Sequence, residues 1–322
     1  MNSICSRVLF AAAVALAAFA AAPGVATAQP LKLVASTGMI ADTVGRIAGD
    51  RAEVTALMGP GVDPHTYRQT RSDIARMAGA DAVFWNGLYL EAQLEEFFLS
   101  LGKRKPVFAV GEGVPVASRL AHDSYRDRYD PHVWMDPSLW RHVVEATRDA
   151  LIELDADGAD SYRANAETVI ADLDRLAAYS RQQLDGVPPT ARVVVTAHDA
   201  FRYFGRAYGF EVIGIQGMST ESEAGLKHIE EMVGLLVDRK IGAIFVESSV
   251  SDRNVKALVE GAAARGWPVK IGGQLYSDAM GPPGTYEGTY LGMIDHNVTT
   301  IAGALGAPVP PGGLDGRLAS TN

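Results

Sequence analysis

Short apolar runs alternate with stretches of helical spacing along most of this 322-residue chain, and this alternation restricts the fold more than any other feature. In the first half, each run is only a few residues long. The stretch after it has apolar residues that recur as on one face of a helix. Strands that alternate with helices indicate a parallel sheet covered on both faces. We therefore expect an α/β lobe with strands at 31–35, 53–58, 82–85 and 106–110 and helices at 40–47, 72–78 and 90–101.

A second series of the same kind begins after residue 190. Between the two series, residues 137–154 and 159–184 have helical spacing, and the second stretch would be roughly 39 Å long at 1.5 Å per residue. The predicted fold class is α/β: two lobes, each a roughly four-stranded parallel sheet flanked by helices, joined by one long rigid helix. The second lobe is expected to have strands at 192–197, 211–215, 243–246 and 269–271 and helices at 200–208, 223–239, 253–265 and 289–305.

These patterns divide the chain into four parts. Residues 1–28 are predicted to be a signal peptide, 29–158 the N-terminal α/β lobe, 159–186 the linking helix and 187–322 the C-terminal α/β lobe. At the end of the last part, residues 306–322 are rich in proline and glycine and are expected to form a loose tail.

The first 28 residues have the pattern of a secretory signal peptide. Arg7 precedes an unbroken apolar run over residues 8–22, and Ala26-Thr27-Ala28 provides the small residues of a cleavage site. No later segment reaches the roughly 20 apolar residues that a membrane helix needs. We therefore expect cleavage after Ala28 and a mature protein in the periplasm that is not membrane-anchored.

Cysteine usage and charge limit the possible ligands. Cys5 is the only cysteine and precedes the apolar core of the signal, so neither a lipid anchor nor a thiolate metal ligand is expected in the mature chain. The net charge of −9 is unfavourable for binding nucleic acid or an anionic membrane, both of which need concentrated positive charge. A cationic ligand is the more natural partner, and we expect a monomer.

Two matching motifs present histidines from stiff turns: Asp-Pro-His65 and Asp-Pro-His132. In each motif the proline fixes its own φ and biases the aspartate before it away from helix. His198 ends an apolar run, and Asp278 lies in a loop flanked by glycines. Ligands of open parallel sheets bind beyond the carboxyl ends of the strands. We therefore predict a metal site in which His65 and His132 on one lobe face His198 and Asp278 on the other.

Each of these residues also has a plainer interpretation. His65 and His132 could cap tight turns, His198 could bind backbone at a strand end, and Asp278 could cap a helix. Glu247, at the end of the most apolar strand, could orient a metal-bound imidazole or pair with a basic group. Two turns built alike suggest two ligands for one site, and for Glu247 both interpretations stay open.

Three imidazoles and one carboxylate form a mostly nitrogen site. Such a site suits Zn²⁺ first, with Mn²⁺ a close second because availability can reverse the order of affinity.

The order of motifs resembles that of the metal-binding solute-binding proteins of ABC importers, the TroA-like zinc and manganese family. The similar motifs are Asp-Pro-His-Thr-Tyr67, Asp-Pro-His-Val-Trp-Met-Asp-Pro137, Thr-Ala-His-Asp-Ala-Phe201, Phe-Val-Glu-Ser-Ser249 and Leu-Tyr-Ser-Asp-Ala-Met-Gly281. The resemblance implies two lobes on a long helix, a divalent metal ion held in the cleft by His65, His132, His198 and Asp278, and delivery to an ABC permease in the membrane.

One alternative comes from a different class of protein. An exported zinc metallohydrolase also uses three protein ligands, with water in the fourth position. Four protein ligands would fill a tetrahedral zinc ion, and Glu247 is the one evident general base. We therefore expect a transport protein and not an enzyme.

Overall fold

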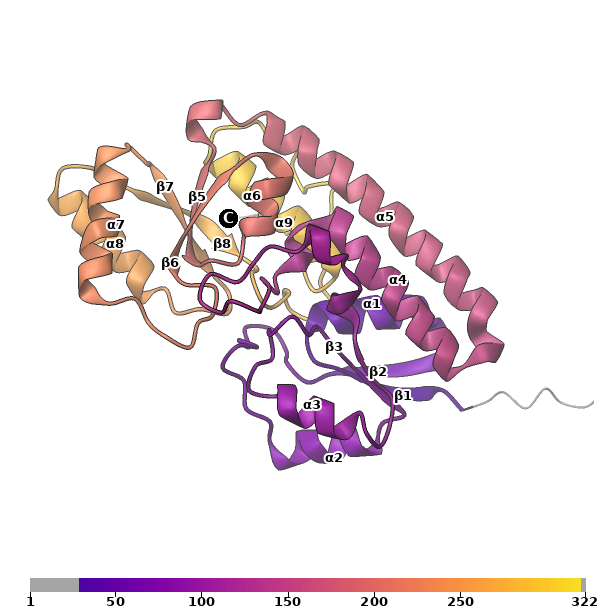
Figure 1. Ribbon diagram of the computed structural model, residues 1–322. Helices are drawn as coiled ribbons and strands as arrows, with labels where there is room; N and C mark the ends of the chain where they lie inside the picture. Colours follow the sequence, from indigo (N-terminus) through magenta and orange to yellow (C-terminus); the bar gives the residue numbers. More distant parts are fainter. Residues whose placement is uncertain (1–28, 320–322) are drawn as a thin grey trace, which may run out of the picture.

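The structure is a computed structural model that describes residues 29–319, so the expected signal peptide lies outside the described part of the chain. Two α/β lobes lie side by side, and a long helix passes along both (Figure 1). We name them the N-terminal lobe, which contains strands β1 to β4, and the C-terminal lobe, which contains β5 to β8. The predicted fold class is confirmed.

The N-terminal lobe is built on a parallel sheet with the strand order β2-β1-β3-β4. β3 is buried along its whole length, and its side chains alternate between two layers, as strand geometry requires. Phe84 packs in the main core with helix α1, and Val83 and Trp85 pack with α2 and α3 on the other face. The elements are β1 (Leu31–Ala35), α1 (Gly38–Ala48), β2 (Ala52–Ala56), α2 (Arg71–Gly79), β3 (Ala82–Trp85), α3 (Glu95–Leu101) and β4 (Val107–Ala109).

Two helices connect the lobes. α4 (Pro137–Leu154) begins as predicted, because Pro137 suits the first helical position and the Asp136 side chain accepts the backbone N–H of Ser138 at 2.9 Å. α5 (Ala159–Asp185) has 27 residues and is therefore about 40 Å long. It packs against α1 of the N-terminal lobe and α9 of the C-terminal lobe, so it supports both (Figure 1).

In the C-terminal lobe, β5 pairs in parallel with β6, β7 pairs in parallel with β8, and β5 lies against β7. α7 and α8 cover one face around Leu236 and Leu258, and α9 packs along β8. The elements are β5 (Val193–His198), α6 (Arg202–Tyr208), β6 (Glu211–Gln216), α7 (Leu226–Asp238), β7 (Ala243–Glu247), α8 (Arg253–Ala264), β8 (Lys270–Leu275) and α9 (Tyr290–Ala304).

β8 extends further than the short run predicted at 269–271. Gly272 and Gly273 interrupt the apolar pattern but not the strand, and the pairing with β7 shifts register beside them. Gly273 has a φ of 148°, and a Cβ atom there would lie 2.5 Å from the methyl group of Thr300. Glycine is therefore required where α9 approaches the strand.

Two expectations need correction. The helix predicted at 90–101 begins at Glu95, because residues 88–94 form turns, in which the backbone N–H of Leu90 donates to Gly87 and that of Leu94 to Glu91. The segment expected to be a loose tail is attached to the fold over its described residues, 306–319. The backbone N–H of Leu314 donates to buried Asp295 at 2.8 Å.

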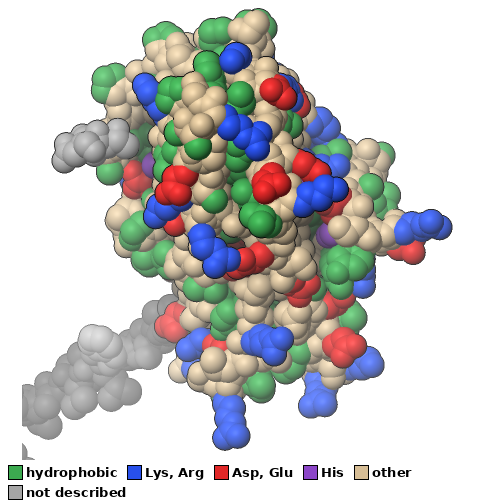
Figure 2. Space-filling view, turned by 90° about the vertical axis from the view of Figure 1, so that its left-hand side faces the viewer, with side chains coloured by type: hydrophobic (Ala, Val, Ile, Leu, Met, Phe, Trp, Pro, Cys, Tyr) green, Lys and Arg blue, Asp and Glu red, His purple; other side chains and the backbone are tan. Residues whose placement is uncertain are grey.

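Acidic and basic side chains are interspersed over the face that carries α7 and α8 (Figure 2). This face therefore lacks the continuous basic patch that nucleic acid binding requires. Among the described residues, no helix combines the length and the apolar character needed to cross a bilayer.

Candidate metal centre

The four predicted ligand residues meet between the two lobes. His65 lies in the turn after β2, and His132 directly precedes the short 3₁₀ helix η4 (Val133–Met135). His198 is the last residue of β5, and Asp278 lies in the loop between β8 and α9. All four are buried, and one ligand atom from each lies within 4.8 Å of those from the others.

Nitrogen and oxygen atoms of the four side chains converge on one point but do not satisfy one another's hydrogen-bonding capacity. The Nε2 atoms of His65 and His132 are 3.3 Å apart. One carboxylate oxygen of Asp278 is 3.2 Å from His198 Nε2 and 3.9 Å from His65 Nε2, and the other is 3.5 Å from His132 Nε2.

A cation would satisfy this arrangement. Despite these short distances, both Asp278 oxygens and His198 Nε2 lack a partner with hydrogen-bond geometry among the described residues. Buried polar atoms without partners destabilise a fold. Three imidazole nitrogens and a carboxylate are ligands suited to a divalent transition metal ion, so the residues present fit such an ion.

Two carboxylates behind the cluster set the orientation of two rings. Asp130 Oδ1 lies 2.8 Å from His132 Nδ1 and also accepts the backbone N–H of His132 at 3.0 Å. Glu247 contacts His198 in the same way: Oε2 lies 2.5 Å from Nδ1, and Oε1 accepts the backbone N–H at 2.8 Å. A proton held on Nδ1 leaves Nε2 of each ring available to a metal.

The role of Asp130 was not singled out from the sequence. The one sequence signal for this role is an aspartate two residues before the histidine. This spacing does not tell whether the aspartate contacts the imidazole ring or only the backbone. Asp63 stands in the same place in the other motif, yet its Oδ1 accepts the backbone N–H of His65 at 2.9 Å, and its other oxygen accepts from Thr66 and Thr220. Glu247, in contrast, contacts the His198 ring and, among the described residues, forms no ion pair with a lysine or arginine.

Burial and the neighbouring carboxylates shift the pKa values of the imidazole rings in opposite directions. Burial lowers the pKa of His65 to about 3. Burial also acts to lower the pKa of His132, but Asp130 and Asp278 outweigh it and raise the pKa to about 9. The pKa of His198 is raised well above its usual value, since Asp278 and Glu247 outweigh burial. Burial acts to raise the pKa of Asp278, but His198 and His132 outweigh it and hold that pKa well below its usual range.

An aromatic side chain packs against the cluster. Trp134 is fully buried, and its ring centroid lies 5.2 Å from that of His132. Trp85 and Trp140 are also buried, but they pack elsewhere, Trp85 against Phe98 and Trp140 against Tyr290. The remaining histidines, His122, His142, His228 and His296, are not part of the cluster.

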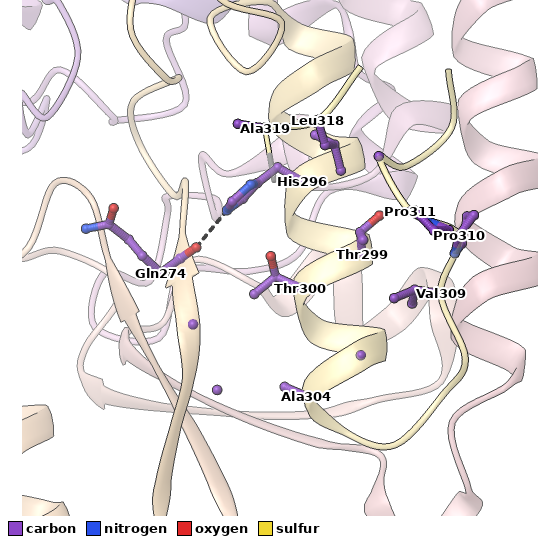
Figure 3. Close-up of a pocket in the computed structure, with 14 residues that line it drawn as sticks. Gln274, His296, Thr299, Thr300, Ala304, Val309, Pro310, Pro311, Leu318 and Ala319 are labelled. Carbon is purple, nitrogen blue, oxygen red and sulfur yellow. Dashed lines mark hydrogen bonds between the residues drawn. The ribbon is translucent and has the colours of Figure 1, made fainter. Parts of the chain in front are cut away.

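A groove of about 680 Å³ lies elsewhere, between β8, α9 and the C-terminal segment (Figure 3). The groove is lined by one imidazole, that of His296, whose Nε2 atom lies 2.9 Å from the carbonyl oxygen of Gln274. The described residues that line the groove include no carboxylate, so it offers no comparable set of metal ligands.

Comparison with known proteins places the chain in a transport family. The model of the family "zinc-uptake complex component A periplasmic" matches residues 33–304. The manganese-binding lipoprotein MntA of Bacillus subtilis is 45% identical over 277 residues, which cover 86% of this chain and 90% of the relative. The zinc-binding protein TroA of Treponema pallidum is 45% identical over 288 residues, which cover 89% of this chain and 92% of the relative.

The solved structure of the periplasmic zinc-binding protein TroA from Treponema pallidum superimposes with a TM-score of 0.83. It is 45% identical, and the match covers 86% of this chain and 99% of that one. Two lobes on a long helix with a buried His/Asp cluster between them define a metal-binding solute-binding protein of an ABC importer. The chain belongs to the family of the periplasmic zinc-uptake complex component A.

Membership of this family also decides between transport and catalysis. Its members are substrate-binding transport proteins, so the chain is not an enzyme and the metallohydrolase alternative is not supported. The family implies a membrane permease as partner.

Proposed function

We propose that this chain captures one Zn²⁺ or Mn²⁺ ion through His65, His132, His198 and Asp278 and delivers it to an ABC permease. The observation that carries the proposal is the convergence of buried Nε2 atoms on both oxygens of Asp278, which have no protein partner of their own among the described residues. Asp130 and Glu247 would serve as the second layer that orients His132 and His198.

Zinc is the first choice and manganese the second. Two relatives of equal identity carry different metals in their names, so similarity alone does not distinguish them. Three imidazoles favour zinc. Both oxygens of Asp278 face the cluster, however, and two oxygen donors with three nitrogens would allow five ligand atoms, which keeps manganese close behind.

The domain organisation proposed from the sequence accompanies this function. Residues 1–28 would be a signal peptide cleaved after Ala28, so that the mature protein works in the periplasm. We expect it to be a monomer. The N-terminal lobe would extend over residues 29–158, the linking helix over 159–186 and the C-terminal lobe over 187–322. Delivery requires the permease to move the lobes enough to detach His198 or Asp278.

Calorimetry on the metal-stripped mature chain, residues 29–322, tests the proposal. We expect one site with affinity of the order of nanomolar, equivalent to about 12 kcal/mol. His198→Ala should abolish this binding, and His228→Ala is the matched control because His228 is an exposed imidazole on α7. Tighter zinc than manganese binding in competition supports zinc, and the reverse order reassigns the metal. Unchanged binding by the His198 variant would overturn the ligand set.

A further inference from the structure

Trp134 connects the turn that carries His132 to the loop that carries Asp278. Its indole Nε1–H donates to the backbone carbonyl oxygen of Ser277 at 2.8 Å, and Ser277 directly precedes Asp278. The two residues are 143 positions apart in the sequence, and both are fully buried. The same indole ring lies edge-on to the His132 ring, with centroids 5.2 Å apart.

The position of Asp278 depends on its backbone neighbours. Among the described residues its carboxylate oxygens have ion pairs with the imidazoles but no hydrogen bond of good geometry, so the backbone of the loop has a large part in placing them. The loop around it is held within the C-terminal lobe by Asn297, which bonds the backbone of Tyr276, and by Ser249, whose hydroxyl is 3.0 Å from that of Ser277. Among the described hydrogen bonds of residues 276–278, the one from Trp134 comes from the other lobe.

Trp134 is itself held firmly. The hydroxyl of Tyr290 donates to the backbone carbonyl oxygen of Trp134 at 2.8 Å. The Tyr290 ring stacks on Trp140 of α4, with centroids 5.2 Å apart and planes within 5° of parallel. Because its backbone and ring are both packed, the indole N–H is a fixed donor at a defined distance from His132.

We propose that Trp134 is a positioning residue that sets the distance between Asp278 and His132, and thereby the geometry offered to the metal ion. This inference rests on the proposed function, in which both residues are ligands. Metal–ligand distances in a well-formed site fall within about 0.2 Å of their standard values, so ligand placement has to be accurate. Loss of a group that orients a ligand typically weakens metal binding by about 10- to 100-fold.

Trp134→Phe tests the inference, because it retains a buried aromatic ring and removes the N–H donor. The matched control is Trp267→Phe. The Nε1–H of Trp267 also donates to a backbone carbonyl oxygen at 2.8 Å, that of Ile241, and this bond lies within the C-terminal lobe away from the cluster. Zinc affinity measured by competition should fall about 10- to 100-fold in the Trp134 variant and remain within about threefold of wild type in the control. Equal losses in both variants would overturn the inference.

A second measurement separates positioning from general loss of packing. Bound Co²⁺ reports ligand geometry through its visible absorption bands, and we expect these bands to change in Trp134→Phe but not in Trp267→Phe. Adding Trp134→Phe to Asp278→Ala should weaken binding little further, because the ligand that Trp134 positions is already absent. If the loss of affinity in the double variant equals the product of the losses in the two single variants, Trp134 acts independently of Asp278 and the inference is wrong. If Asp278→Ala alone leaves affinity unchanged, the proposed ligand set fails instead.

Discussion

His198 Nδ1 lies 2.5 Å from Glu247 Oε2, and both groups are fully buried. The same carboxylate accepts the backbone N–H of His198 through its other oxygen at 2.8 Å. The bond joins the ends of β5 and β7, two strands that lie against each other. It holds the Nδ1 proton and turns Nε2 toward Asp278, so one carboxylate determines both the orientation and the basicity of the ring.

Replacing Glu247 should weaken metal binding without dismantling the site. Glu247→Gln keeps one oxygen acceptor for Nδ1–H, removes the negative charge and replaces the acceptor of the His198 backbone N–H by an amide NH2, so His198 becomes a weaker base and its ring is held less firmly. We expect the zinc affinity to fall by about 10- to 100-fold. Glu211→Gln is the control, because Glu211 pairs with Arg239 at the surface. Competition with a chelating dye measures both, and an unchanged affinity in Glu247→Gln would contradict this role.

Metal binding should release protons at neutral pH. The pKa of His132 is raised to about 9 by Asp130 and Asp278, and that of His198 is also raised, so both rings carry a displaceable proton in the metal-free protein at pH 7. His65, with its pKa lowered to about 3, carries none. Affinity should therefore fall about tenfold per pH unit, on lowering the pH, for each proton released. Calorimetry in two buffers of different ionisation enthalpy counts these protons, and a count near zero at pH 7 would exclude the raised pKa values.

Local periodicity allowed much of the fold to be predicted. β1 and β3 lie at the predicted residues, and α4 and α5 match to within a residue, because their apolar spacing and caps are encoded in neighbouring residues. The four buried residues of the cluster could be selected for a similar reason. Each follows a stiff turn or a strand end, and the carboxyl ends of parallel strands lie at one edge of their sheet.

Contacts between distant residues could not be predicted in this way. Glu247 meets His198 only because β7 lies beside β5, 49 positions along the chain. The C-terminal segment has the composition of a loose tail, yet buried Asp295 on α9 accepts the backbone N–H of Leu314 and attaches the segment to the fold. A segment rich in proline and glycine indicates that regular helices and strands are unfavourable there. It does not tell whether the segment is attached to the fold, which here depends on a carboxylate 19 residues away.

A buried carboxyl group in the N-terminal lobe should make stability depend on pH. Glu91 accepts hydrogen bonds from Ser36, Asn86 and Gly87, but burial outweighs them and raises its pKa from 4.5 to about 7. The folded protein then binds more protons than the unfolded chain between these values. Its free energy of unfolding should fall by about 3 kcal/mol as the pH rises through this window, at about 1.4 kcal/mol per unit of pKa shift.

Glu91→Gln isolates this effect because glutamine does not titrate. Other groups contribute equally to both proteins, so the quantity to measure is the difference in free energy of unfolding between them, by urea titration of metal-free protein at pH 5 and pH 8. The variant should gain stability relative to wild type at the higher pH. A difference that is the same at both pH values would mean that Glu91 titrates alike in the folded and unfolded states.

One hydrogen bond across the cleft should slow the exit of the metal ion. Thr220, in the loop between β6 and α7, donates its hydroxyl to Asp63 Oδ2 at 2.5 Å, and the other oxygen of Asp63 accepts the backbone N–H of His65. The C-terminal lobe thus contacts the turn that carries His65.

Thr220→Val preserves the shape of the side chain and removes the hydroxyl donor. A hydrogen bond to a charged acceptor is worth about 1.5–3 kcal/mol. Stopped-flow transfer of bound zinc to a chelator should therefore become about 10- to 100-fold faster. In the control Thr285→Val, the lost hydroxyl bonds only within its own turn, to Pro282 and Gly288, so the rate should not change. Equal rates in wild type and Thr220→Val would mean that the lobes separate without breaking this bond.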